Sequence, residues 1–160
     1  MGKFNKFLTI ISLFLISACS YAQATQPTIV NWAVDATIAT FTYNAKNVEQ
    51  RLPVMQQYFT AQGWTDYMNA LNKSGNIETV KTDNLAVSAT TMGNPKTTKH
   101  TIVDGVDEWI VELPILVTYA HANASKEAHY WIYLNIVKNN ADNARYPYAI
   151  KQLIAKPREN

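Results

Sequence analysis

The chain has 160 residues, of which 48% are hydrophobic and 16% charged, with one cysteine and a formal net charge of +2. This composition indicates one folded domain with a single core, and the lone cysteine excludes a disulfide within the chain. Removing Lys3 and Lys6 from the 14 basic residues leaves 12, which equals the 12 acidic residues. The rest of the chain therefore lacks the surplus of cations that nucleic-acid binding requires, and no nucleic-acid partner is expected.

Residues 1–22 are predicted to be a signal peptide for export. Lys3 and Lys6 precede an uncharged apolar run over residues 7–18. This run is about a dozen residues long, whereas a helix that crosses a bilayer needs about 20. The pattern favours a cleaved leader over a permanent membrane anchor, and it predicts a periplasmic protein.

Two ways of processing the leader fit the sequence. The small residues of the stretch SYA favour cleavage between Ala22 and Gln23. The stretch ISAC resembles a lipobox, in which Cys19 is lipidated and attaches the protein to a membrane. Both remain open. Residues 23–28 are predicted to form a short tether in front of the domain.

The first half of the domain is predicted to be mostly helical. The predicted helices cover residues 29–43, 47–59, 60–74 and 77–81, the last one capped by Asn76. Asn47 and Gln50 form a weak capping box, and Pro53 predicts that the second helix restarts there. Thr60 is a suitable N-cap for the third helix, and Gly75 a suitable end.

The second half is predicted to be a sheet, because the period of its hydrophobic residues changes to two. Strands are expected in LAVSATTM, TKHTIVDG, EWIVELPILVTYAHA and HYWIYLNIVKN, which form an antiparallel meander of four strands. Alternate residues from Trp109 to Val117 share one face of the third strand, and Pro114 predicts a bulge or an edge. Residues 148–155 are predicted to form a short closing helix, followed by a frayed tail over residues 156–160. Helices on one face of such a sheet make an α+β domain.

The histidines are candidate metal ligands. His121 and His129 flank one predicted hairpin near Glu127, and His100 lies on another strand. Structural zinc sites use four ligands, usually with cysteine, so the sequence favours exposed hairpin histidines and no metal. We find no nucleophile motif, and five glycines do not suggest a phosphate-binding loop, so neither a catalytic residue nor a cofactor is expected.

Asp35 is the one candidate for a catalytic base, since a sheet curved around a helix can enclose a carboxylate. A solvated aspartate on the outer face of the helix is the favoured interpretation.

The four tryptophans of the chain are Trp32, Trp64, Trp109 and Trp131. All four are predicted to occupy core positions, and one or two of them could instead anchor an interface.

Several segments together resemble the periplasmic domain of the DotI/IcmL family of type IVB (Dot/Icm) secretion systems. They are NWAVDATIATFTYN, YFTAQGWTDYMNALNKSGNIETVKTDNLAVSAT, WIVELPILVTYAHA and IVKNNADNARYPYAIKQLIA. The resemblance covers residues 29–155, and its most specific part is YFTAQGW with SGN and the later LPILVTY.

This resemblance implies a cystatin-like (nuclear-transport-factor-like) cone of helices against a curved antiparallel sheet. It also implies a non-catalytic part that assembles with copies of itself and with other secretion-system components. Family members resembling this domain carry a cytoplasmic segment and a transmembrane helix ahead of it, and here the short leader takes their place. A different expectation also stays open, namely a periplasmic small-molecule binder or enzyme that uses the mouth of the cone with Asp35 or His100.

Overall fold

The computed structural model describes residues 28–141 and 144–158. Within these ranges the elements are α1 (Ile29–Thr40), β1 (Tyr43–Asn44), α2 (Val48–Gln56), α3 (Ala61–Lys73), α4 (Asn76–Thr82), β2 (Ala86–Thr91), β3 (Lys96–Val103), β4 (Val106–His121), β5 (Ala124–Lys138) and β6 (Tyr148–Pro157). The strands form one antiparallel sheet in the order β1-β2-β4-β5-β6, and β3 pairs with β4 outside this path. The predicted α+β class is confirmed, although the described sheet has six strands and not four.

The sheet differs from the predicted meander because β2 and β3 share one edge of the long strand β4. β3 pairs with residues 106–112 of β4, and β2 pairs with residues 115–120. Pro114 lies at the junction, where its carbonyl accepts a hydrogen bond of 2.9 Å from the Met92 amide. In an antiparallel strand, the N–H and C=O groups of one residue point to the same side. The Pro114 nitrogen therefore faces the junction, as its carbonyl does, and its lack of an N–H removes no hydrogen bond between β4 and β5.

The sequence predicts a bulge or an edge at Pro114. No bulge is present, because the pairing of β4 with β5 runs through Pro114 and Trp131 without a shift, and on the other side Pro114 lies in the gap between the pairings of β2 and β3. Register shifts occur instead between Thr97 and Lys99 and between Asn135 and Ile136.

The last element is a strand, so the predicted closing helix over residues 148–155 is wrong. β6 pairs antiparallel with the outer edge of β5 from Tyr148 to Pro157, and it includes the first two residues of the expected tail. Without β6, the N–H and C=O groups along that edge of β5 would lack partners beside the core. This long-range requirement outweighs the local pattern of YAIKQLIA, whose paired apolar residues suit a helix as well as a strand.

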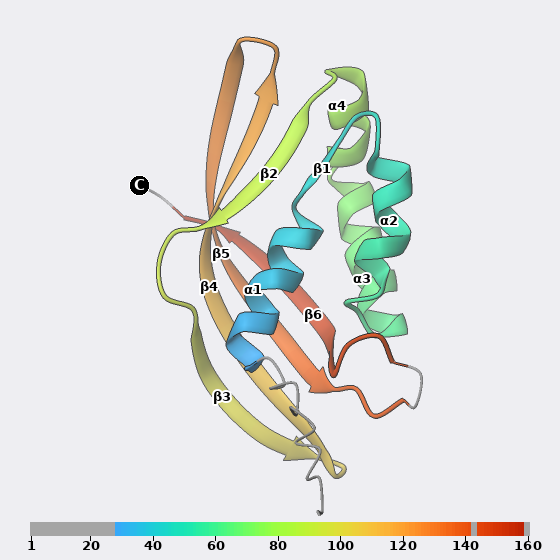
Figure 1. Cartoon of the computed structure of the whole chain (residues 1–160), viewed down its shortest axis with the longest axis vertical. Helices are drawn as coiled ribbons and strands as arrows, with labels where there is room; N and C mark the ends of the chain where they lie inside the picture. The colour runs from blue at the N-terminus through green and yellow to red at the C-terminus, as the bar shows by residue number, and fades with distance from the viewer. Residues whose placement is uncertain (1–27, 142–143, 159–160) are drawn as a thin grey trace, which may run out of the picture.

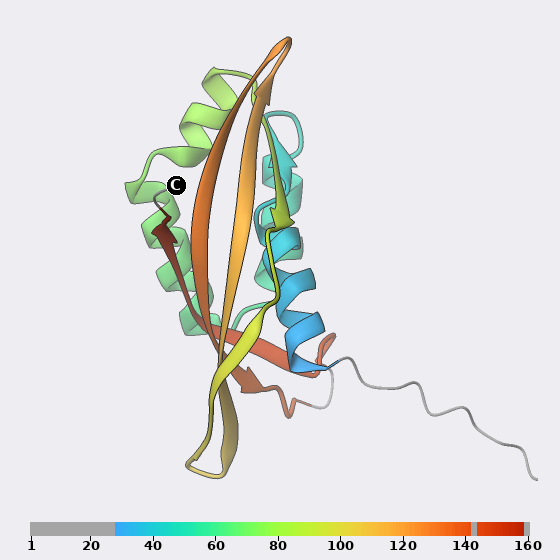
Figure 2. The ribbon, with the colours of Figure 1, turned by 90° about the vertical axis from the view of Figure 1, so that its left-hand side faces the viewer.

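The helices gather on one side of the curved sheet (Figure 1). Figure 2 shows α1 and α2 on one flank of the β4–β5 ribbon and α3 and α4 on the other. The face of β4 toward the helices is the predicted one, since Val111, Leu113, Ile115 and Val117 are all fully buried. From the helices Trp32, Ala33, Met55 and Val80 join the core, and from β5 Ile132, Leu134 and Ile136 do so.

The helix ends follow the predicted capping residues in part. Thr60 caps α3, with its hydroxyl accepting a hydrogen bond of 3.0 Å from the Gly63 amide. Gly75 ends this helix region with a φ of 67°. Asn47, however, makes no side-chain cap, because its amide oxygen accepts from the Asn44 amide instead. α2 also continues through Pro53 without restarting.

α3 and β6 approach each other closely at Gly63. A Cβ atom at this position would lie 2.5 Å from the carbonyl oxygen of Ile150 and 2.8 Å from that of Lys151. The Thr60 amide also donates to the Ile150 carbonyl at 2.9 Å, and the Ile150 amide donates to the Tyr58 carbonyl at 2.7 Å. The segment before α3 is thus attached to β6, which closes that flank of the cone.

Candidate functional site

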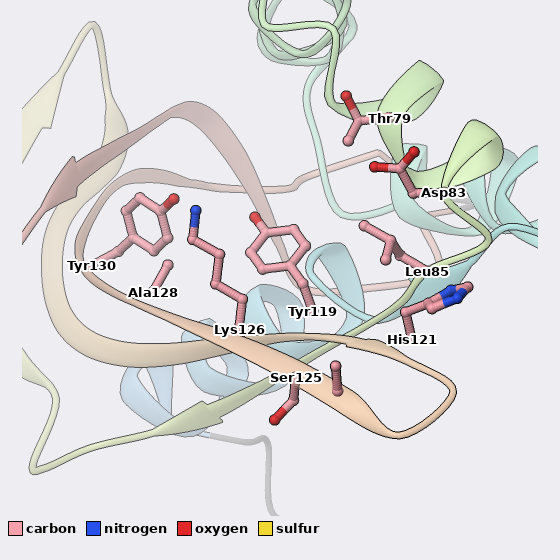
Figure 3. Close-up of a pocket in the computed structure, with 10 residues that line it drawn as sticks. Thr79, Asp83, Leu85, Tyr119, His121, Ser125, Lys126, Ala128 and Tyr130 are labelled. Carbon is pink, nitrogen blue, oxygen red and sulfur yellow. The ribbon is translucent and has the colours of Figure 1, made fainter.

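A cleft opens where the β4–β5 hairpin extends beyond the helices. It has a volume of about 550 Å³ and lies between the hairpin, α4 and the segment that follows α4. The alternation of β4 and β5 continues the core face outward, so Tyr119, Lys126 and Tyr130 point into the cleft (Figure 3). Leu85, Thr79 and Asp83 form the opposite wall.

A second hollow of about 320 Å³ adjoins this cleft and shares Tyr119 and Tyr130 with it. It lies between α3 and β6 and is lined in part by Tyr43 and Tyr67. The Tyr43 hydroxyl donates a hydrogen bond of 2.7 Å to the Asn76 side-chain oxygen. The two adjoining hollows together form the mouth of the cone, and four tyrosine rings line it.

Burial raises the pKa of Tyr43, Tyr67 and Tyr119, which line this mouth. Tyr43 and Tyr67 have pKa values well above the ordinary range for tyrosine, because burial disfavours the charged phenolate. Burial also raises the pKa of Tyr119, and its neighbour Tyr130 raises it further. These hydroxyls therefore stay protonated, and they can serve as neutral hydrogen-bond donors at physiological pH.

Two opposite charges border the cleft. Lys126 of β5 is paired with Tyr119 of β4, and Figure 3 shows its amino group between the rings of Tyr119 and Tyr130. Asp83 follows the end of α4 on the opposite wall. Neither side chain takes part in an ion pair with another residue in the described parts of the chain.

The other face of the sheet, which we call the outer face, carries a second group of aromatic side chains. Trp131 and Tyr133 of β5 point away from the core, opposite in register to Lys156 and Ile154 of β6. The Lys156 amino group lies 5.0 Å from the Tyr133 ring centre, and the Arg158 guanidinium carbon lies 5.5 Å from that of Trp131. Aromatic and arginine side chains are enriched at protein interfaces relative to the rest of the surface.

The structure separates the candidate metal ligands. His121 lines the cleft, whereas His129 lies on the outer face, because Ile132 and Leu134 fix which residues of β5 face the core. His100 contacts Asp107 at 2.8 Å and stacks on Trp109 with ring centres 4.9 Å apart. Within the described residues, no three metal-binding side chains lie together.

Asp35 is exposed on α1 and does not line the cleft or the adjoining hollow. Burial raises the pKa of Tyr58 to about 12, with a further contribution from the hydrogen bond with Tyr146 and a smaller one from the Asp35 charge. His100 is also exposed and lies outside both hollows. The structure thus offers neither residue an enclosed position for catalysis.

The tryptophans fall into two groups. Trp32 is buried in the core, and Trp64 and Trp109 pack against it. Trp131 lies on the outer face, so the expectation of core positions holds for the other three and not for this one. The predicted leader, with Cys19 and the Ala22–Gln23 bond, lies outside the described residues.

Sequence reasoning missed the residues of the cleft. Tyr119 and Tyr130 read as ordinary strand residues, whereas Lys126 falls before the strand predicted to begin at His129, and Asp83 follows the short helix predicted over residues 77–81. The alternation of β4 and β5 does place the first three on the core face, but only the tertiary structure shows that no helix covers them there. A usable signal appears only when the alternation of the predicted strand is extended from Tyr130 back to Lys126, which then places a lysine on the apolar side.

The family described as "Type-IV b secretion system, inner-membrane complex component" (DotI/IcmL) matches residues 12–157. The periplasmic domain of DotI is 31% identical with a TM-score of 0.79, and the match covers 85% of this chain and 99% of that one. An IcmL-like type IV secretion system protein from Legionella pneumophila is 27% identical with a TM-score of 0.74, covering 84% and 96%.

A periplasmic fragment of TraM shares the fold at 22% identity and a TM-score of 0.72, covering 79% of this chain and 93% of that one. Comparison with curated proteins finds no match. Among the described residues, no helix has the length and apolarity needed to span a bilayer. Because the family match extends over most of the sequence, including every described helix and strand, the chain belongs to the DotI/IcmL family of type IVB secretion system components.

Proposed function

We propose that this protein is exported to the periplasm, where it acts as a non-catalytic structural or accessory component of a type IVB secretion or conjugation apparatus. The family match over residues 12–157 is the observation that carries this proposal. The likeness to the periplasmic domain of DotI over 99% of that domain's length supports the same location. The exposed positions of Asp35 and His100 agree with a function in assembly and not in catalysis.

The outer face is the surface that we assign to contacts with other components or with a second copy of the chain. Trp131 and Tyr133 are partly exposed there, and Ile154 is 40% exposed. Large aromatic and arginine side chains contribute much of the binding energy in protein interfaces. Arg158 and Lys156 lie over the rings and supply positive charge beside them.

The partner proposal is tested by co-purification of the tagged full-length protein from its own envelope. We expect secretion-system components in the complex, and self-association at micromolar concentration in sedimentation experiments. Trp131→Ala should weaken at least one of these associations about tenfold or more. Ile102→Ala is the matched control, because Ile102 is 69% exposed at the far end of β3. Equal behaviour of both variants, or turnover of a substrate by the purified protein, would contradict the proposal.

The leader is tested separately with the full chain and a Cys19→Ala variant. Mass spectrometry of the purified protein should show either a new N-terminus at Gln23 or a lipidated Cys19. In the first case, Cys19→Ala leaves processing unchanged. In the second case, the variant loses its membrane attachment. An intact Met1 on cytosolic protein would refute export.

A further inference from the structure

The cleft beside the β4–β5 hairpin combines an apolar interior with two opposite charges. Tyr119, Tyr130 and Leu85 provide apolar surface, and Lys126 and Asp83 stand on opposite walls. The volume of about 550 Å³ lies within the range of about 300 to 1,000 Å³ that is typical of small-molecule sites. This combination of features points to a ligand that is apolar in its body and charged at both ends.

We propose that the cleft binds a short hydrophobic peptide such as a dipeptide, which is a zwitterion with one charge at each end. The ligand carboxylate contacts the Lys126 amino group, and its ammonium group contacts Asp83. The apolar side chain packs on the rings of Tyr119 and Tyr130. This site is independent of the proposed role in secretion and of the outer face, which lies on the other side of the sheet.

Charge balance favours a zwitterion over a ligand with one charge. An anion placed at Lys126 would also face the Asp83 carboxylate, and a cation placed at Asp83 would face Lys126. A zwitterion satisfies both groups at once, and each contact is a charge-assisted hydrogen bond. Three hydroxyl groups, those of Thr79, Tyr119 and Tyr130, supply further donors around the charged groups. His121 lies at the rim, beyond Lys126 toward the hairpin turn.

The adjoining hollow extends the space available to the ligand. Tyr119 and Tyr130 line both the cleft and this hollow, and Tyr67 and Leu153 line the hollow on the side of α3 and β6. A second apolar side chain can enter this hollow while the charged ends remain at Lys126 and Asp83. A hydrophobic dipeptide therefore has more contact surface than a single amino acid, and we expect it to bind more tightly.

The proposal is tested by calorimetric titration of the full-length protein with phenylalanine and with the dipeptide Phe-Leu. The same dipeptide is then used with an acetylated N-terminus and with an amidated C-terminus. We expect saturable binding of Phe-Leu, and a loss of affinity of about fivefold or more for each blocked form. Lys126→Met should remove the effect of amidation and keep that of acetylation. Asp83→Asn should do the reverse.

Lys99→Met is the control, because Lys99 is an exposed lysine on β3, which does not line the cleft. It should leave all affinities unchanged. Lys126 and Asp83 are exposed, so their variants are expected to fold, and circular dichroism checks this. The proposal is overturned if Phe-Leu shows no saturable binding up to about 10 mM. Equal affinities for the free and blocked dipeptides would also overturn it.

Discussion

Gly63 shows how a single residue limits the packing of two elements. A side chain at this position would meet two backbone carbonyl oxygens of β6, at 2.5 Å and 2.8 Å from its Cβ atom. Backbone atoms in a paired strand cannot move aside as the end of a flexible side chain can. Gly63 lies in the stretch YFTAQGW, so the most specific part of the family resemblance contains a residue that the fold requires.

Gly63→Ala should therefore destabilise the protein, although alanine is normally the better helix residue. We expect the free energy of unfolding to fall by about 2 kcal/mol, which is typical of overpacking. Urea unfolding followed by circular dichroism measures this change. Gly93→Ala is the control, because its added Cβ would lie at an ordinary 3.5 Å from the Pro114 side chain. An unchanged midpoint for Gly63→Ala would show that α3 can shift away from β6.

The residues of the cleft illustrate what sequence reasoning could not reach at this scale. Lys126 and Asp83 are 43 positions apart, and no motif or periodicity relates them. They border one cleft because β4 and β5 are longer than the helix layer that covers them. That mismatch in length is a property of the assembled fold and not of any one segment.

At the scale of elements, α3 has the best-defined start. The Thr60 hydroxyl accepts from the Gly63 amide, and the Thr60 amide donates to β6. Thr60 thus holds the first turn of the helix through its side chain and attaches the helix to the sheet through its backbone amide. The cap was readable from the sequence because threonine before a helical pattern is a strong N-cap signal.

Removal of this cap is expected to cost about 1 kcal/mol in the free energy of unfolding. Thr60→Ala tests it, again by urea unfolding. Thr28→Ala is a matched comparison, because Thr28 caps α1 through a longer hydrogen bond of 3.3 Å at an exposed position. We expect a smaller loss for Thr28→Ala. A larger loss for Thr28→Ala than for Thr60→Ala would contradict this order of the two caps.

Element type was predictable where the local pattern and the tertiary environment agree. The four helices and the strands β2 to β5 follow from periodicity and turn residues, and the structure contains all of them. β6 was not predictable, because YAIKQLIA has no clear period and its partner β5 decides its conformation. The pairing of β2 and β3 with the same edge of β4 was also not predictable from local sequence. The loop of residues 92–95 connects these two strands beside Pro114, and that position is visible only in the folded structure.

At the scale of the whole molecule, the sheet presents two different surfaces. Its inner face ends in the tyrosine-lined mouth of the cone, and its outer face carries Trp131 and Tyr133 with their cations. Ligand binding at the first surface need not disturb contacts at the second. Both surfaces nevertheless depend on the same strand, because β5 contributes Tyr130 to the mouth and Trp131 to the outer face.

The buried tyrosines make the stability of the whole fold sensitive to high pH. An unfolded tyrosine ionises near its ordinary pKa of 10.0, whereas burial keeps Tyr67 and Tyr43 protonated in the folded protein at higher pH. Tyr58 adds to this effect, with its pKa raised to about 12. Above pH 10 the unfolded state therefore holds fewer protons than the native state, and the free energy of unfolding falls as the pH rises.

Tyr67→Phe separates this effect from packing, because it removes the hydroxyl and keeps the ring. Urea unfolding of the wild type and the variant at pH 7 and at about pH 11 measures it. The stability that Tyr67 contributes through its raised pKa is complete below pH 10 and is lost as the pH rises toward the folded pKa. The variant has no such group, so its stability should fall less between the two pH values than that of the wild type. Equal losses in both proteins would show that Tyr67 ionises as freely in the folded protein as in the unfolded chain, and that the mouth of the cone is open to water down to this residue.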